Sequence, residues 1–222
     1  MMESDLNSEA GTVALRKAKN CWDEANTLFL TEDFRSAMML FHRCILMARG
    51  IYQDCSVALH QNSAAGISHS VSATESIGNS EDTTVPQKLE DHRIKVEDER
   101  SEVAKLIADC YIGLARCVLK GRVRTAEDYQ RAAQYCDNVI ESNPNNTVAF
   151  QIKAEALFKA EKYNDALAIL QQIPETQDTI TLAEECNRAL QMKRRQRDEL
   201  IQANFARQNA PNEPGMNGHA LH

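Results

Sequence analysis

The chain has 222 residues, of which 43% are hydrophobic and 26% charged, and this ordinary globular composition excludes a wholly disordered chain. The net charge of −7 argues against binding to nucleic acid, and an aromatic content of 5% argues against a β-sandwich. Only 8 glycines and 5 prolines interrupt the chain, so we expect long helices.

At the N-terminus, residues 1–11 are expected to be disordered. The first residues are acidic and lack an apolar core, so they do not resemble a signal peptide. The longest apolar stretch, residues 106–119, is interrupted by Asp109 and Arg116 and is too short to span a bilayer, so no membrane span is expected.

Three segments share one helical stripe, which consists of an aromatic residue, an alanine at +3, an apolar residue at +7 and a small or apolar residue at +10. The segments begin at Phe34, Tyr129 and Tyr163. Steps of three and four residues place these side chains on one helix face. Tyr129 and Tyr163 are 34 positions apart, whereas Phe34 and Tyr129 are 95 apart, so an insertion separates the first two repeats.

A second pattern precedes each stripe: a large residue or a cysteine, a small residue four positions later and an apolar residue three positions after that. It begins at Cys21, Tyr111 and Phe150. The two patterns together resemble the two helices of a tetratricopeptide hairpin. This resemblance predicts an all-α fold, an α-α superhelix of three helix hairpins, over residues 12–52, 88–144 and 145–175. An unrelated helical bundle is the alternative.

The segments outside the repeats differ in composition. The Ser-rich insertion at residues 53–87 is expected to be disordered, and the sequence does not decide whether its serines are phosphorylated. A helical pattern over residues 176–208 predicts a long C-terminal capping helix, because a solenoid needs a terminal element with one polar face. The tail at residues 209–222 is expected to be disordered and includes His219 and His222, which we interpret as tail residues rather than metal ligands.

Several stretches extend the likeness from the general repeat to one subfamily. They are FHRCIL at 41–46, ARGI at 48–51, DCYIGLARCVL at 109–119 and the DYQR run at 128–131. With the insertion and the charged last helix, they resemble the tetratricopeptide repeat protein 9 family, whose repeats are similar to those of immunophilins and of the aryl-hydrocarbon-receptor-interacting protein. This resemblance implies a scaffold in which the first helix of each hairpin lines a concave groove.

Relatives often hold the acidic tail of a heat-shock chaperone in that groove, through a clamp of lysine, asparagine and arginine side chains that bind two carboxylates. Asn26 is the one residue here that matches the clamp. The remaining positions carry other residues, and Lys19 or Lys153 could supply charge only from a different spacing. The non-matching positions are Trp22, Gly113, Val148 and Ile152.

The sequence therefore predicts a non-enzymatic, monomeric, cytoplasmic adaptor that binds a peptide or helix of a partner protein and needs no cofactor. A co-chaperone with a degenerate clamp is the alternative. Trp22 is interpreted either as a binding anchor or as a core residue. The candidate groove residues are Lys19, Trp22, Asp23, Asn26, Asp109, Ile112, Gly113, Arg116, Val148, Gln151, Ile152 and Glu155.

Two further groups of residues were weighed as sites. The seven cysteines are odd in number and form no Cys-x-x-Cys, so we expect free thiols in a reducing compartment. Cys110, Cys117 and Cys136 are interpreted as core thiols in preference to a metal or redox site. The basic run at 193–197 is either a nuclear-import signal or a solvated helix face.

Overall fold

The computed structural model describes residues 3–68, 84–122 and 124–208, which form seven α-helices and no strand. The all-helical class predicted from the sequence is therefore confirmed for the described residues. None of their helices is long and apolar enough to cross a membrane. The chain divides after Pro174 into two units, which are described separately.

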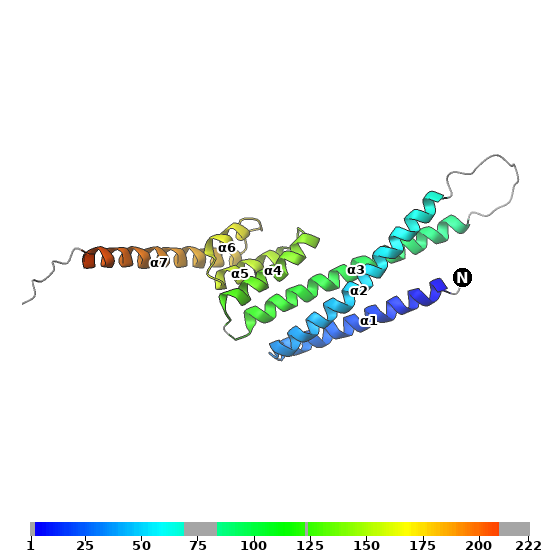
Figure 1. The fold of residues 1–222 in the computed structure, drawn as a ribbon, viewed down its shortest axis with the longest axis horizontal. Helices are drawn as coiled ribbons and strands as arrows, with labels where there is room; N and C mark the ends of the chain where they lie inside the picture. The colour runs from blue at the N-terminus through cyan, green and yellow to red at the C-terminus, as the bar shows by residue number, and fades with distance from the viewer. Residues whose placement is uncertain (1–2, 69–83, 123, 209–222) are drawn as a thin grey trace, which may run out of the picture. The chain divides into compact units, whose positions relative to one another are not determined.

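The first hairpin consists of α1 (Glu3–Leu30) and α2 (Phe34–Ser68), joined by residues 31–33 (Figure 1). Glu32 has a φ of 63°, the left-handed conformation that ends a helix and reverses the chain. Asp33 then caps α2, because its Oδ1 accepts a hydrogen bond of 3.1 Å from the Ser36 backbone N–H. The pKa of Asp33 is lowered by its hydrogen bonds with Ser36.

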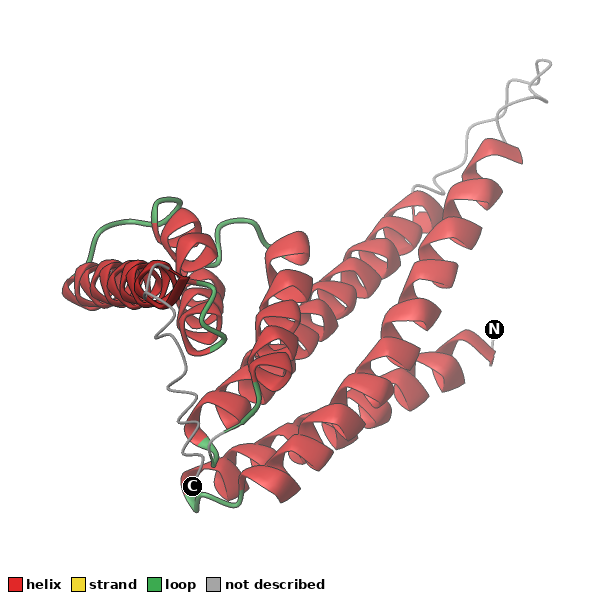
Figure 2. Cartoon of the chain, turned by 60° about the vertical axis from the view of Figure 1, so that its left-hand side comes forward, coloured by secondary structure: helices red, strands yellow, loops and turns green. Residues whose placement is uncertain are grey.

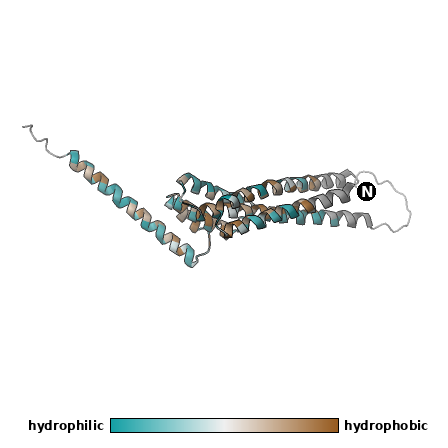
Figure 3. Ribbon diagram, turned by 90° about the horizontal axis from the view of Figure 1, so that it is seen from below, coloured by the Kyte–Doolittle hydropathy of each residue, from teal (hydrophilic) through white to brown (hydrophobic). Residues whose placement is uncertain are grey.

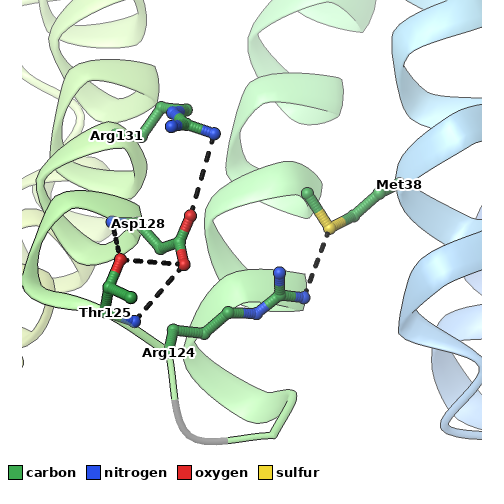
Figure 4. Close-up of polar contacts among 5 residues, drawn as sticks. All are labelled: Met38, Arg124, Thr125, Asp128 and Arg131. Atoms are coloured by element: carbon green, nitrogen blue, oxygen red, sulfur yellow. Dashed lines mark hydrogen bonds and ion pairs between the residues drawn. The ribbon is translucent and has the colours of Figure 1, made fainter.

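The second hairpin consists of α3 (Thr84–Lys120) and α4 (Ala126–Ser142). A capping box begins α4, in which Thr125 and Asp128 each accept a hydrogen bond from the other's backbone N–H (Figure 4). Arg124, directly before this box, donates through Nη2 to the sulfur of Met38 at 3.8 Å. The connection between α3 and α4 is thereby attached to α2.

The third hairpin consists of α5 (Thr147–Lys159), capped by the Asn146 side chain, and α6 (Tyr163–Leu170). Its turn repeats the geometry of the first hairpin. Glu161 has a φ of 60°, and Lys162 N–H bonds to Leu157 at 2.9 Å as Asp33 N–H bonds to Leu28 at 3.0 Å. Lys162 makes no side-chain capping bond at α6, unlike Asp33 at α2.

The helices of this first unit pack in chain order, and α2 runs beside α3 over much of its length (Figures 1 and 2). The first helices of successive hairpins also contact one another, α1 with α3 and α3 with α5. The small residues that the repeat pattern places at helix contacts have no exposed surface, so the predicted register is correct. They are Ala25, Ala37, Ala115, Ala132, Ala154 and Ala166.

The helices extend further than the sequence predicted. We expected disorder at residues 1–11 and 53–87, but α1 begins at Glu3, α2 continues to Ser68 and α3 begins at Thr84. At the predicted end of repeat one, α2 and α3 are joined, since Arg100 Nη2 donates to the hydroxyl of Tyr52 at 3.0 Å, and Cys55, three residues further along α2, is buried. Residues 69–83 and the tail 209–222 lie outside the described residues.

The second unit contains α7 (Gln177–Gln208). Thr176 and Thr179 exchange hydrogen bonds at its start, of which the Thr176 N–H to Thr179 Oγ1 bond is 2.8 Å long. Every residue from 191 to 208 is exposed, and hydrophilic residues predominate along the helix (Figure 3). The role of α7 as a capping helix stays a prediction.

Candidate functional site

A hollow of about 150 Å³ lies between α1 and α3, and we call it the α1/α3 hollow. It contains six of the twelve residues that the sequence predicted for a groove, and two phenylalanines complete it. The predicted residues are Trp22, Asn26, Asp109, Ile112, Gly113 and Arg116, and the additional ones are Phe29 and Phe41.

Gly113 and Phe41 determine the shape of the hollow on the α3 side. A Cβ atom at Gly113 would stand 2.5 Å from Cζ of Phe41 and 2.7 Å from its Cε1, closer than such atoms approach. Phe41 is 1% exposed, so apart from the hollow that it lines, its ring has no open space into which to turn. Glycine at 113 is therefore what admits the α2 ring beneath α3. No clamp asparagine fits there while Phe41 keeps this position.

Two polar side chains of the hollow lack partners in the described part of the chain. The Nδ2 atom of Asn26 is buried and makes no hydrogen bond. Asp109 is half-buried and makes no hydrogen bond or ion pair, and burial raises the pKa of its carboxyl. The positive charges of Lys105 and Arg116 partly counter that rise. The hollow thus offers one unused donor and one poorly solvated acceptor beside aromatic rings.

The two lysines that could have replaced clamp cations are already paired. Lys19 of α1 forms an ion pair with Glu102 of α3. Lys153, the other residue that could have replaced a clamp cation, pairs with Asp137 at 2.6 Å and is 20% exposed. A carboxylate ligand would have to compete with these acidic partners.

The other predicted groove residues do not line the hollow. Asp23 is exposed on α1. On α5, Ile152 is buried while Val148 is 39% exposed, and Glu155 pairs with Lys159 at 3.4 Å. The remaining predicted residue of α5, Gln151, is half-buried.

Sequence reasoning missed Phe29 and Phe41 as lining residues. Phe41 occupies the apolar +7 position of the first stripe, and it is buried. The signal for Phe29 was available, since it lies three residues after Asn26 and therefore on the same face of α1. It also stacks edge-on against Phe34, with ring centroids 5.5 Å apart.

All seven cysteines are free and buried. The Cys44 thiol donates to the Ala18 carbonyl at 3.2 Å, which ties α2 to α1. Burial raises the pKa of Cys117 and of Cys136 to about 12, so both are poor nucleophiles. Within the described residues, no group of three His, Cys, Asp or Glu side chains is placed to hold a metal ion.

The basic run at 193–197 lies on the exposed part of α7. Arg197 pairs with its neighbour Asp198 at 3.8 Å, and both side chains are more than half exposed, so this pair adds little stability. Nothing in this geometry distinguishes an import signal from a solvated helix face.

Comparison with known proteins finds a match to a tetratricopeptide repeat over part of the chain. Residues 124–182, which run from the start of α4 into α7, match the family model described as "Tetratricopeptide repeat". Among solved structures, the TPR domain of P58(IPK) matches with 13% sequence identity and a TM-score of 0.36. That match covers 79% of this chain and 47% of the other, so the chain spans about half of that domain. No curated protein matches the sequence.

Proposed function

We propose that this chain, whose residues 124–182 match a tetratricopeptide repeat, is a non-enzymatic adaptor that binds a segment of a partner protein at the α1/α3 hollow. Tetratricopeptide repeats are generally protein-interaction modules. The observation that carries the proposal is the unsatisfied Asn26 Nδ2 inside a hollow with aromatic walls. A buried donor without an acceptor is costly, and a ligand that supplies the acceptor recovers that cost.

The seven buried free thiols support a reducing compartment, so we place the adaptor in the cytoplasm, as a monomer. The likeness of the first two hairpins to the tetratricopeptide repeat protein 9 family is part of this proposal and extends beyond the matched residues. The residues described above are consistent with it.

The experiment is a pull-down from cytosolic extract with wild type and two variants. Trp22→Ala removes an aromatic wall of the hollow, whereas Leu46→Ala removes a side chain that is 72% exposed on α2, away from the hollow. We expect the proteins captured by wild type to be lost with Trp22→Ala and retained with Leu46→Ala. Equal capture by wild type and Trp22→Ala would place binding on another surface.

The co-chaperone alternative rests on Asn26 alone. The paired Lys19 and Lys153 and the space filled by Phe41 beside Gly113 all oppose an acidic tail in the hollow. The adaptor function is therefore favoured over the chaperone clamp.

A further inference from the structure

The size of the α1/α3 hollow limits what it can hold. Its volume is about 150 Å³, whereas pockets for drug-sized ligands span roughly 300–1,000 Å³. A cavity of about 150 Å³ in another protein holds a single benzene ring. One side chain of a partner, with a ring at most, therefore fills this hollow.

Charge excludes two classes of side chain. An acidic group would share the small hollow with Asp109, and two carboxyl groups in one site cannot both ionise without repulsion. A basic group could pair with Asp109, but it would also meet Arg116, and because ammonium and guanidinium groups have no acceptor it would leave the Asn26 Nδ2 unsatisfied. The occupant is therefore neutral.

Hydrogen bonding distinguishes between the neutral side chains that could fill the hollow. A leucine or phenylalanine would fill the volume but would leave both Asn26 and Asp109 desolvated without partners. A phenol hydroxyl both donates and accepts, so it can donate to the Asp109 carboxylate and, once the Asn26 side chain rotates to expose its buried Nδ2, accept from the Asn26 amide. Its ring also suits walls made by Trp22, Phe29 and Phe41, since aromatic pairs gain beyond their buried area.

We propose that the α1/α3 hollow takes the side chain of a tyrosine from the partner segment, with its hydroxyl placed between Asn26 and Asp109. This inference rests on the proposed function, because it names the anchor that the same site receives. It predicts that a tyrosine, and neither an acidic chain end nor a lysine, identifies the partner segment.

The test uses the full chain and four side-chain analogues: p-cresol for tyrosine, toluene for phenylalanine, n-butylamine for lysine and propionate for glutamate. Trp22 is the single tryptophan of the chain and lines the hollow, so its fluorescence, excited at the red edge, reports binding there. A hydrogen bond to a charged group predicts that p-cresol binds about tenfold more tightly than toluene.

Variants then test whether Asn26 and Asp109 cause the preference for p-cresol over toluene. We expect Asn26→Ala and Asp109→Leu to bring the p-cresol to toluene ratio within about twofold, while Asp23→Leu, an exposed carboxylate on α1 outside the hollow, leaves the ratio unchanged. Asp109→Asn keeps the side-chain shape if Asp109→Leu does not fold, and it should lower the ratio because a neutral acceptor binds a hydroxyl more weakly.

Equal binding of toluene and p-cresol, tighter binding of n-butylamine or propionate, or no response of Trp22 to any analogue would each overturn the tyrosine assignment. The comparison in wild type needs no variant, so it decides the matter even if every substitution unfolds the chain. If the Trp22→Ala variant fails to capture the partners in the pull-down while any of these results is found, the tyrosine assignment is wrong but the adaptor function is still supported. Retention of the partners by Trp22→Ala would instead place their binding on another surface, whatever the analogues show.

Discussion

At the scale of single residues, the contact between Gly113 and Phe41 decides the chemistry of the hollow. A side chain at position 113 would overlap the ring of Phe41, which already fills that space. The site consequently has an aromatic floor where a carboxylate clamp would have an amide.

Gly113→Ala tests this contact. The added methyl group would overlap a ring that is 1% exposed, so we expect the free energy of unfolding in urea to fall by about 1–3 kcal/mol. Gly50→Ala is the matched control, because it also lies within a long helix and a Cβ there meets nothing within 4 Å. Alanine at 50 should raise stability by about 0.5–1 kcal/mol. Equal effects at both positions would contradict the overlap.

Calorimetry with an acidic peptide that ends in free carboxylates tests the ligand preference of the same residues. We expect weak binding that changes little on Asn26→Ala, because Lys19 and Lys153 are held by acidic partners and Asp109 repels carboxylates. Micromolar affinity that weakens with salt and disappears in Asn26→Ala would instead support the chaperone clamp.

At the scale of helices and turns, the first and third hairpins use one turn geometry with different residues. Glu32 and Glu161 both adopt a positive φ, and the residue after each bonds back to a carbonyl five residues before it. The second hairpin departs from this, since five residues separate α3 from α4 and a capping box starts the helix. The repeat pattern therefore determines helix packing more strictly than it determines the turns.

Glu32→Gly tests the strain in that turn. A left-handed φ is unfavourable for a residue with a Cβ but not for glycine, so we expect the free energy of unfolding to rise by about 0.5–1 kcal/mol. Glu24→Gly, at an exposed position inside α1, should lower it by about 1 kcal/mol. A loss of stability on Glu32→Gly would show that the Glu32 side chain supports the turn.

The sequence predicted the helix contacts better than the helix ends. Alanines at the +3 positions are buried as expected, because the helical spacing of three and four residues can be recognised from the local sequence alone. The continuation of α2 to Ser68 was missed because it depends on α3, a partner distant in sequence, whose Arg100 donates to the hydroxyl of Tyr52 at the predicted end of repeat one. Serine content alone did not reveal that partner.

Of the twelve residues that the sequence predicted for the site, six line the α1/α3 hollow. Residues on α1 and α3 were located because the stripe gave their register, whereas α5 was assigned to the same groove without evidence of distance. The unpartnered state of Asn26 and the burial of Asp109 depend on three helices at once. No local pattern contains that information.

At the scale of the first unit, cysteines occupy several of the fully buried core positions. Cys44, Cys110, Cys117 and Cys136 have no exposed surface. Burial raises the pKa of Cys117 and Cys136, so folding holds the protons of these two thiols to a higher pH than an unfolded chain does. Stability at alkaline pH thus depends on the core as well as on surface charge.

This dependence gives a prediction with a definite sign. Cys117 and Cys136 have a pKa of about 12 in the fold against an ordinary thiol value of 9.0, so their contribution is full below about pH 9 and is lost as the pH rises towards 12. Each thiol lowers the free energy of unfolding by at most about 1.4 kcal/mol per pH unit in that window. We expect urea unfolding to show a shallower decline in the double variant Cys117→Ala and Cys136→Ala. Identical slopes would mean that the thiols ionise in the fold.

The overlap at Gly113 also constrains the order in which substitutions can accumulate. An asparagine at 113 is tolerated only after Phe41 has become smaller, while a smaller residue at 41 leaves a void until position 113 gains a side chain. Either first step is destabilising by itself, so the two positions must change almost together. A chain that has this pair keeps its aromatic floor, and a change to carboxylate binding would require it to pass through a less stable intermediate.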